Sequence, residues 1–589
     1  MFNKKELSTM ANAARLLALE AIQTAGSGHV GAALGFADVI TTLFANHLRF
    51  DPLNGEWSER DRFILSPGHA SALLYAVLHL AGYPVPRKAL KSFRRIGGLP
   101  GHPELNPRMG VEMTTGPLGQ GVASAVGVAM ACPDSKVYAA ASDGDLMEGV
   151  ALEAAAFASV QNLGNLIVLW DDNGITIDGP AADANIPARF QAMGWEVITL
   201  DGMNPSEIDN ALGAAVKAKR PVLLACKTII GYGCRDQGTS KAHGAPLDEA
   251  DAAEFTARLS RDLTAGADLW AKLANSKAGK SDGQSGREAE VKVFSMPAAT
   301  PRDYATRELF NLVMKAAVSA NPNLIIGGSA DLGASTGAKV GASNYINYGV
   351  REHAMGAIMN GLALCGMRPY GSTFLAFSDY MRPAARLAAM MNLPVLFVFS
   401  HDSIALGEDG PTHQPIEQLP SLRLIPNLAV LRPCNLREVF LCLKHHFASG
   451  GPSAIITSRQ AFPSVPDCGA AASVSGYIVA GDKGAKVKLF ASGSEVALAL
   501  AVREILAAKK ITAAVISAPS LELLKQEFIQ MAAGAFSVWI EASAQTSPLP
   551  VSMAVRIDGF GASDRGDAVY ARFGFDAAAI AKKIITRLS

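Results

Sequence analysis

The sequence predicts an α/β protein built from three successive α/β domains with mostly parallel sheets. The chain has 589 residues, which is more than a single hydrophobic core usually serves. Short apolar strands alternate with segments of helical periodicity along its length, and this alternation is typical of parallel sheets that are covered on both faces. A hydrophobic content of 49% against 18% charged residues indicates a well-packed globular protein.

The first domain is predicted over residues 1–273, with helical patterns separating four strands. These strands are "KVYAAAS" (136–142), "NLIVLWDDN" (165–173), "WEVITL" (195–200) and "PVLLACKTI" (221–229). A stretch rich in Ser, Gly and Lys, "ANSKAGKSDGQSGREAEVK", follows. Such a composition lacks the apolar side chains that a core needs, so we expect an exposed linker over 274–300.

The second domain is predicted over 301–466 and the third over 467–589. Strands of the second are expected at "NLIIGGSADL", "RPYGSTF", "PVLFVFSHD", "LAVLRP" and "SAIITS". Those of the third are expected at "KVKLFAS", "TAAVISAPS" and "FSVWIEAS". Each run is short, apolar and bounded by turn-forming residues, as buried strands are.

Charge and cysteine content exclude several classes of protein. Lys+Arg and Asp+Glu number 53 each, so no basic field would attract nucleic acid or an anionic membrane. The seven cysteines are scattered without a CxxC pair, which argues against a disulfide framework or a zinc site. The amino-terminal stretch lacks the apolar core of a signal peptide. We therefore expect a cytoplasmic protein with no nucleic-acid or membrane partner.

Polar groups gather where two predicted strands end. Asp143 and Gly144 follow "KVYAAAS", and Asn173 follows "NLIVLWDD". In a parallel sheet, ligands collect at the carboxyl ends of the strands, and carboxylate, carboxamide and backbone carbonyl oxygens suit Mg²⁺ or Ca²⁺. The alternative is that Asp143 and Asn173 only cap helices or close turns.

Longer strings resemble the transketolase family over nearly the whole chain. The "DG", 28 residues and "N" between Gly144 and Asn173 are similar to the thiamine diphosphate fingerprint, although Ser142 stands where the family usually has glycine. The other matching strings are "TAGSGHVGAALG", "DRFILSPGHASALLY", "LPGHPE", "GVEMTTGPLGQG", "TIIGYG", "SKAHGAPL", "YGVREHAMGAIMNG", "TFLAFSDY" and "HDSIALGEDGPTHQP". The resemblance implies two thiamine-diphosphate-binding-type domains, for the diphosphate and metal (1–273) and for the pyrimidine (301–466), and a C-terminal transketolase-type domain.

The resemblance also implies a cofactor site for thiamine diphosphate and a divalent ion, Mg²⁺ or Ca²⁺. Asp143, Asn173 and the carbonyl of Ile175 would hold the metal. The cofactor would be contacted by His69, Gly116, Pro117, Leu118, Gly144, Asn173 and His243, with the two histidines at its diphosphate. Glu148 would order the diphosphate loop, with a plain surface acid as the alternative. Asp145 receives no role, and a solvated position is the simplest interpretation.

Glu352 is the predicted central catalytic residue, because the family uses a carboxyl group beside the aminopyrimidine ring to form the thiamine ylide. On the sequence alone, a surface pair of Arg351 and Glu352 is the alternative. The aromatic side chains at spacings of three would stack on the aminopyrimidine or form an ordinary core stripe; they are Phe374, Phe377 and Tyr380.

The implied reaction moves a two-carbon ketol unit from a ketose phosphate to an aldose phosphate through a dihydroxyethyl intermediate. Histidines in the matched strings suit proton transfer and hydrogen bonding to sugars, and we expect all six to converge on one cleft. His29 and His243 would assist the aldehyde, His102 and His413 would contact the ketol oxygens, and Asp409 would read hydroxyl configuration. His401 and Arg459 would bind the phosphate.

One part of the substrate site departs from the family. The arginine expected a few residues beyond "SADL" is absent, and Lys339 stands in roughly its place. The segment 332–348 is also shorter than in the family. Lysine keeps the charge but loses the bidentate geometry of arginine, so phosphate affinity would be weaker or the preferred ketose smaller or unphosphorylated.

The resemblance further implies an obligate homodimer with active sites between subunits, in which Glu153 would approach Glu352 of the partner. The expected activity is that of a transketolase acting on xylulose 5-phosphate and ribose 5-phosphate in the pentose phosphate pathway of carbohydrate metabolism. The alternatives are a relative with other substrates, dihydroxyacetone synthase-like or phosphoketolase-like, the more distant 1-deoxyxylulose-5-phosphate synthase, and a non-catalytic homologue. The third domain carries no recognisable catalytic motif, and dimer packing is its simplest role.

Overall fold

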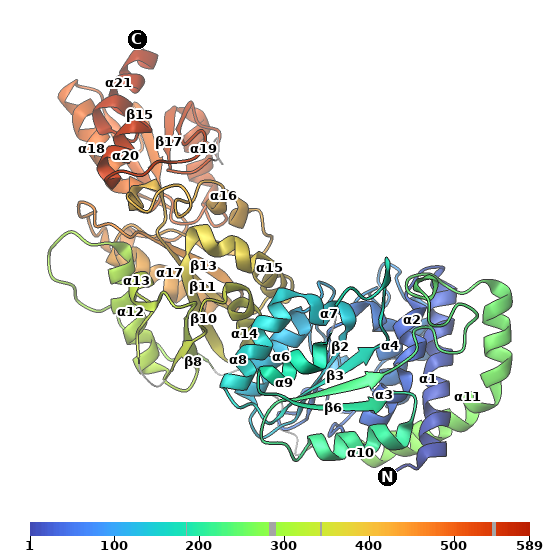
Figure 1. Cartoon of the computed structure of the whole chain (residues 1–589). Coiled ribbons are helices and arrows are strands. Elements are labelled where there is room, and N and C mark those ends of the chain that lie inside the picture. The colour runs from blue at the N-terminus through green and yellow to red at the C-terminus, as the bar shows by residue number, and fades with distance from the viewer. Residues whose placement is uncertain (184, 282–289, 342–343, 545–548) are drawn as a thin grey trace. The chain divides into compact units, whose positions relative to one another are not determined.

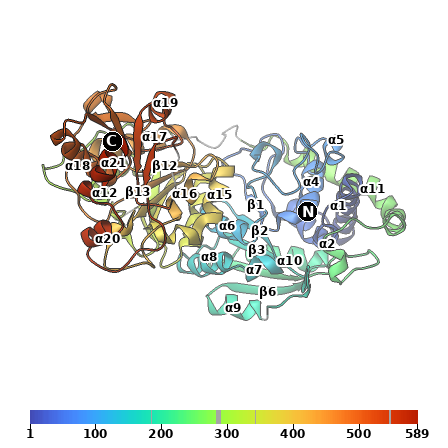
Figure 2. The same cartoon turned by 90° about the horizontal axis from the view of Figure 1, so that it is seen from above.

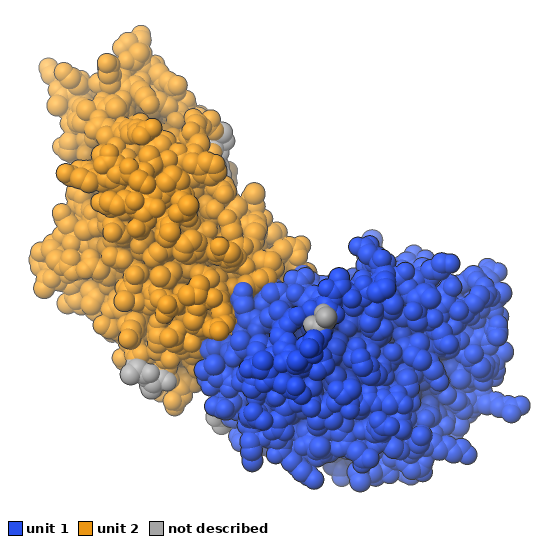
Figure 3. All heavy atoms as spheres, viewed as in Figure 1, with its two compact units in different colours: residues 1–288, 360–366 blue, residues 289–359, 367–589 orange. Residues whose placement is uncertain are grey.

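The chain has an α/β fold with mostly parallel sheets, which confirms the predicted fold class (Figure 1). The computed structural model describes residues 1–183, 185–281, 290–341, 344–544 and 549–589. These residues form two compact units, residues 1–288 with 360–366 and residues 289–359 with 367–589 (Figure 3). Among the described residues, the first unit holds one large sheet and a two-stranded hairpin, and the second unit holds two large sheets.

The sheet of unit 1 is wholly parallel, with the strand order β1-β2-β3-β7-β6. The four predicted strands are present, together with β1 at the edge, which was not predicted. Their bounds are β1 Arg62–Leu65, β2 Val137–Ser142, β3 Leu166–Asp172, β6 Glu196–Asp201 and β7 Val222–Lys227; a small hairpin pairs β4 Ile175–Thr176 with β5 Gly179–Pro180.

Helices surround this sheet, and the amino-terminal helix lies beside the long helix α11 in both views (Figures 1 and 2). Asn3 and Glu6 form a capping box that starts α1, and Gly26 ends it in a left-handed conformation. The bounds are α1 Lys4–Ala25, α2 Val30–Gly35, α3 Ala37–Thr42, α4 Ser71–Leu80, α5 Arg87–Leu90, α6 Gln120–Ala131, α7 Asp143–Met147, α8 Gly149–Val160, α9 Ile186–Ala192, α10 Pro205–Ala215 and α11 Glu249–Lys277. Helix α11 thus enters the stretch expected to be a linker, of which residues 282–289 lie outside the described residues.

The first sheet of unit 2 is also parallel, with the order β12-β13-β11-β10-β8-β9. Its strands are β8 Ile325–Ser329, β9 Tyr345–Asn347, β10 Arg368–Phe374, β11 Leu396–Ser400, β12 Ala429–Leu431 and β13 Ser453–Thr457. Its helices are α12 Thr306–Ala320, α13 Gly333–Thr336, α14 Glu352–Leu364, α15 Arg382–Met390, α16 Gln418–Arg423 and α17 Leu436–Ser449, with a 3₁₀ helix at Leu375–Met381. Residues 360–364 at the end of α14 belong to unit 1.

The second sheet of unit 2 has the order β14-β16-β15-β17-β18, and β14 runs antiparallel to β16 at its edge. Its strands are β14 Tyr477–Ala480, β15 Val487–Ala491, β16 Ala513–Ser517, β17 Phe536–Ile540 and β18 Met553–Val555. Its helices are α18 Glu495–Ala508, α19 Gln526–Gly534, α20 Gly566–Arg572 and α21 Ala577–Leu588.

Candidate active site

The carboxyl ends of β2 and β3 bring Asp143 close to the segment that follows Asp172. The two strands pair in parallel, with Ser142 opposite Asp171. One carboxylate oxygen of Asp143, Oδ2, accepts a hydrogen bond from the backbone N–H of Gly174 at 3.0 Å. Ser142 is the N-cap of α7 and accepts from the N–H of Asp145, so Asp143 is not the capping residue.

Asn173 lies on the other side of this edge. Its Oδ1 accepts from the N–H of Ile175 at 3.0 Å, as in a turn closed by a side chain, and its Nδ2 donates to Asp171 at 3.0 Å. Asn173, Ile175 and Asp143 line the same cavity, which has a volume of about 370 Å³. Asn173 therefore closes a turn, as in one alternative, and also lines the cavity, as a metal ligand would in the other.

Carboxylates are crowded at this edge of the sheet. Burial, followed by the nearby charge of Asp172, raises the pKa of Asp143 to about 6. Burial also raises the pKa of Asp171 to about 7. Since burial and like charges both disfavour ionised carboxyl groups, a cation placed here would stabilise their charged forms.

Asp145 is fully buried, and the expectation that it is solvated is wrong. Its Oδ1 accepts from the hydroxyl of Ser66 at 2.5 Å and from the N–H of Gly119 at 2.7 Å. Its Oδ2 accepts from both the N–H and the hydroxyl of Ser142 at 2.9 Å. Asp145 therefore ties the glycine-rich segment 115–121 to the ends of β1 and β2.

Four of the predicted histidines come together at the same cavity. Ring centroids lie 5.4 Å apart for His29 and His69, 5.9 Å for His29 and His243, 5.3 Å for His69 and His243, and 6.2 Å for His29 and His102. These rings line the cavity with Gly116, Leu118, Gly144 and the acidic edge. Gly116 has a φ of 155°, a conformation open to glycine, and Pro117 beside it is exposed.

The histidines of this cluster are held neutral at physiological pH. Burial, with Arg94 and the neighbouring histidines, lowers the pKa of His29 to about 4. Burial and the other three histidines lower the pKa of His69 to about 3. Neutral imidazoles can both accept and donate a hydrogen bond. Nδ1 of His243 is buried and has no hydrogen-bond partner among the described residues, so it is available to a ligand.

Two predicted acids lie at the surface end of this region. Glu148, between α7 and α8, is exposed, and its Cβ would lie 2.8 Å from a Cβ added to Gly119. Glu153 is half-buried on α8. Glu148 thus lies beside the glycine-rich segment 115–121, the loop that it is predicted to order.

Glu352 begins α14 in unit 2 and is 8% exposed. Its Oε1 accepts a hydrogen bond from the hydroxyl of Thr373, in β10, at 3.0 Å. Arg351 donates to the carbonyl of Tyr348 at 3.0 Å. The alternative of a surface Arg351–Glu352 pair does not describe the buried position that Glu352 occupies.

The aromatic triplet lines one face of the 3₁₀ helix at Leu375–Met381. Side chains three residues apart eclipse in such a helix, and the ring centroids of Phe374 and Phe377 lie 5.7 Å apart and those of Phe377 and Tyr380 6.1 Å apart. Tyr380 is 65% exposed, so the triplet is not an ordinary core stripe.

The other two motif histidines, His401 and His413, join this aromatic face rather than the cluster in unit 1. The ring of His401 stacks on Phe374 with 3.6 Å between centroids, and that of His413 lies 5.2 Å from Phe377. The six histidines are therefore found as a group of four in unit 1 and a pair in unit 2. Asp409 and Lys339 are exposed, and Arg459 is half-buried.

The donor groups at the cavity of unit 1 fit a diphosphate and its metal. Asp143, Asn173 and the carbonyl of Ile175 would supply hard oxygen ligands, and neutral histidines and glycine backbone would meet phosphate oxygens. The described residues contain no cluster of three or more His, Cys, Asp or Glu side chains placed to hold a metal ion. The metal would therefore need the carboxamide and the backbone carbonyl besides Asp143.

Sequence reasoning missed several residues that complete these sites. Thr373 supports Glu352, Asp171 contacts Asn173, and Arg94 lies 3.2 Å from Nδ1 of His29. Thr373 lies within the quoted string "TFLAFSDY" and Asp171 within "NLIVLWDDN". The pairing of strand ends could have pointed to Asp171, whereas no signal in the sequence connects Arg94 to His29.

Among the described residues, none of the helices is both long and apolar enough to cross a membrane.

The chain matches three sequence families in order. They are "Transketolase, thiamine diphosphate binding domain" over residues 7–293, "Transketolase, pyrimidine binding domain" over 302–464 and "Transketolase-like TK C-terminal domain" over 476–576.

Curated and solved relatives agree with these matches. The chain is 40% identical to the transketolase of Cereibacter sphaeroides over 98% of each chain. Its structure resembles transketolase from Leishmania mexicana, with a TM-score of 0.92 and 32% identity over 99% of this chain and 97% of that one. A transketolase of Pichia stipitis in complex with sedoheptulose 7-phosphate has a TM-score of 0.86 and 34% identity over the same shares. The chain therefore belongs to the transketolase family of thiamine diphosphate-dependent transferases.

Proposed function

We propose that this protein is a transketolase that transfers a two-carbon ketol unit from a ketose phosphate of the xylulose 5-phosphate type to an aldose phosphate of the ribose 5-phosphate type. The observation that supports this best is the four-histidine cavity of unit 1, which meets the acidic edge of β2 and β3. Neutral histidines beside a site for a diphosphate and a cation suit a polyhydroxylated substrate. The proposed setting is the pentose phosphate pathway in the cytoplasm.

Thiamine diphosphate, when bound, would supply the nucleophilic carbon and accept the electrons of the broken carbon–carbon bond. Asp143, Asn173 and Ile175 would hold Mg²⁺ or Ca²⁺. His69, His243 and the segment Gly116–Leu118 would face the diphosphate. Gly144 leaves room for the side chain of Leu118 to lie against its backbone, since a Cβ at Gly144 would lie 2.8 Å from Leu118.

Glu352 would hold a proton at the aminopyrimidine, and Thr373 would orient its carboxyl group through their 3.0 Å hydrogen bond. Phe374, Phe377 and Tyr380 would offer a ring surface for the pyrimidine. His29, with its low pKa, is a neutral base that could take a hydroxyl proton and return it. His102, His413 and Asp409 would bind the sugar oxygens.

We further propose a homodimer in which each active site joins unit 1 of one subunit to unit 2 of its partner. The residues proposed to bind the diphosphate and the metal belong to unit 1, and Glu352 and the aromatic rings belong to unit 2. A complete site needs both sets. Glu153 would approach the partner subunit in this arrangement.

A related ketol transferase with smaller or unphosphorylated substrates is the second candidate. It is favoured by the exposed Lys339 in place of an arginine. The Pichia stipitis relatives were solved with sedoheptulose 7-phosphate and fructose 6-phosphate, which favours phosphorylated sugars for the family.

The test is a coupled assay with thiamine diphosphate and Mg²⁺ that compares xylulose 5-phosphate with xylulose as donor and ribose 5-phosphate as acceptor. Turnover of the phosphorylated donor, reduced at least about a hundredfold in Glu352→Ala, is the expected result. Turnover of xylulose alone would support the second candidate. Turnover unaffected by Glu352→Ala would refute the assigned role of this residue.

A further inference from the structure

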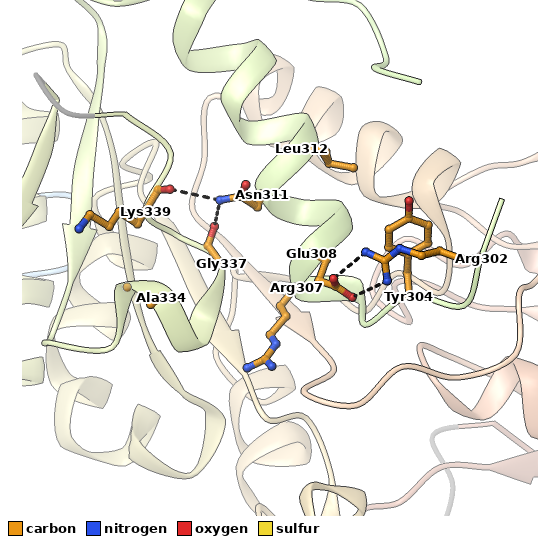
Figure 4. A pocket seen from close by; sticks show the side chains of 10 residues that line it. Arg302, Tyr304, Arg307, Glu308, Asn311, Leu312, Ala334, Gly337 and Lys339 are labelled. Atoms are coloured by element: carbon orange, nitrogen blue, oxygen red, sulfur yellow. Dashed lines mark hydrogen bonds and ion pairs between the residues drawn. The ribbon is translucent and has the colours of Figure 1, made fainter. Parts of the chain in front are cut away.

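A pocket in unit 2, with a volume of about 540 Å³, is lined by the first turns of α12 and by the segment after β8 (Figure 4). Three cationic side chains line it: Arg302, Arg307 and Lys339. Arg302 is already neutralised, because its guanidinium binds Glu308 at 2.8 Å and lies 3.8 Å from the ring centre of Tyr304. Two cations are therefore left to attract an anion.

Lys339 is directed away from Arg307. Its exposed ammonium points to the other side of the pocket in Figure 4, and its backbone carbonyl accepts from Nδ2 of Asn311 at 3.2 Å. The same Nδ2 donates to the carbonyl of Gly337 at 2.7 Å. Asn311 thus fixes the backbone at Lys339 and leaves its side chain in solvent.

Arg307 is held beside Arg459 by a pair of reciprocal hydrogen bonds between the residues that precede them. The N–H of Thr306 donates to the hydroxyl of Ser458 at 2.9 Å, and the N–H of Ser458 donates to the hydroxyl of Thr306 at 2.7 Å. Nη1 of Arg307 also donates to the carbonyl of Ser335 at 2.6 Å. These contacts hold the half-buried Arg307 side chain in place.

His401 belongs to the same group of positive or hydrogen-bonding side chains. It follows Ser400, which lies opposite Thr457 in the parallel pairing of β11 with β13, and Arg459 comes two residues after Thr457. Burial, then the charges of Arg307 and Arg459, lower the pKa of His401 to about 3. Nδ1 of His401 lies 2.9 Å from the Ser400 hydroxyl. When Nδ1 accepts a hydrogen bond from this hydroxyl, the neutral ring carries its hydrogen on Nε2, which can donate it to a ligand.

The charges of this group are left largely unbalanced. Arg459 has Glu408 at 4.0 Å. Among the described residues, no carboxylate lies within ion-pair distance of Arg307, since Glu308 binds Arg302. Burial and the charge of Arg459 lower the pKa of Arg307. Two arginines held together without a full complement of acids form a site for a dianion such as phosphate.

We propose that Arg307, together with Arg459 and His401, binds the phosphate of the sugar substrate. Arg307 replaces the arginine of the family, at whose place in the sequence this chain has Lys339. This inference rests on the ketol-transfer function proposed above. It explains how the site keeps two guanidinium groups for a phosphate although one arginine is missing. Arg307 is thus a specificity-determining residue for phosphorylated sugars.

Inorganic phosphate tests the site without any turnover. Its dissociation constant for the full chain, measured by calorimetry, should rise at least about tenfold in Arg307→Gln, because a charge-assisted hydrogen bond is lost. Arg307→Lys should recover part of the affinity. Arg302→Ala combined with Glu308→Ala, which removes the neighbouring ion pair as a whole, should bind phosphate like the wild type. Lys339→Ala should lose less affinity than Arg307→Gln.

Turnover then separates this inference from the function on which it rests. Arg307→Gln should raise KM for xylulose 5-phosphate at least about tenfold and leave KM and kcat for xylulose nearly unchanged. Equal losses with both donors would show a merely structural role and overturn the inference, as would unchanged phosphate affinity or a larger loss in Lys339→Ala. Absence of turnover in the wild type would refute the proposed function, while phosphate binding would still decide the role of Arg307.

Discussion

Asp143 shows how one side chain can be prepared for a cation by its neighbours. It accepts hydrogen bonds from Trp170 at 3.1 Å and from Gly174 at 3.0 Å, so its carboxylate is fixed at the cavity. Burial and Asp172 raise its pKa to about 6. A divalent ion would lower this pKa again, because it favours the ionised carboxylate. We therefore expect metal binding and the ionisation of Asp143 to be coupled.

We predict that a chelator abolishes ketol transfer and that Mg²⁺ restores it. In Asp143→Asn, the Mg²⁺ concentration for half-maximal activity should rise at least about tenfold, since a charged oxygen ligand is lost. Asp172→Asn is the matched control: its carboxylate lies 2.5 Å from Nζ of Lys227, so a smaller change is expected. Metal titration followed by activity and by calorimetry would measure both, and wild-type metal affinity in Asp143→Asn would contradict the assignment.

At the scale of elements, the ends of parallel strands carry the residues of the proposed sites. In unit 1, β2 and β3 deliver Asp143 and Asn173, while in unit 2, β11 and β13 deliver His401 and Arg459. Parallel pairing aligns the carboxyl ends, so short segments that are distant in sequence meet at one edge. Buried polar residues then join these ends to the loops beside them.

Asp145 is such a residue, and its loss should loosen the glycine-rich segment. Asp145→Ala leaves the N–H groups of Gly119 and Ser142 without their acceptor in a buried site, which should lower the free energy of unfolding by about 3 kcal/mol. Asp134→Ala, at an exposed position of the same unit, should change it by less than about 0.5 kcal/mol. Urea unfolding of both variants measures this, and equal stabilities would contradict the anchoring role.

The strands of the fold could be predicted from the sequence because buried parallel strands are short apolar runs. Some strands at sheet edges were not predicted. They include β1, which begins with the charged Arg62, and β14, which pairs antiparallel to its neighbour. The motifs indicated most candidate site residues but not their neighbours. Asp145 accepts a hydrogen bond from Ser66, 79 residues away, and Thr306 beside Arg307 donates one to Ser458 beside Arg459, 152 residues away. Such long-range contacts leave no local pattern.

At the scale of the whole molecule, buried neutral histidines make stability depend on pH. His446 is buried, its Nδ1 lies 3.1 Å from the hydroxyl of Ser453, and its pKa is lowered to about 3, first by burial. A histidine whose folded pKa is below its unfolded value of about 6.5 stabilises the fold fully above that value. This stability is lost as the pH falls from about 6.5 towards 3, because only the unfolded chain takes up the proton.

Lowering the pH from 7.5 to 5.0 should therefore cost about 2 kcal/mol through His446 alone. His446→Gln should remove this part of the pH dependence. His445→Gln, at the half-buried neighbouring position, should remove less. Urea unfolding at the two pH values measures the difference, and an unchanged pH dependence in His446→Gln would show that this histidine is not held neutral in the fold.

The shared site of the proposed dimer is tested most directly by mixing two inactive chains. Asp143→Ala damages unit 1 and Glu352→Ala damages unit 2, so a dimer with one subunit of each kind keeps one intact site if sites join different subunits. Co-expressed and purified together, the two variants should recover about a quarter of the wild-type ketol transfer, because about half of the dimers are mixed and each has one working site. Activity no higher than that of either variant alone would contradict an active site built from unit 1 of one chain and unit 2 of its partner.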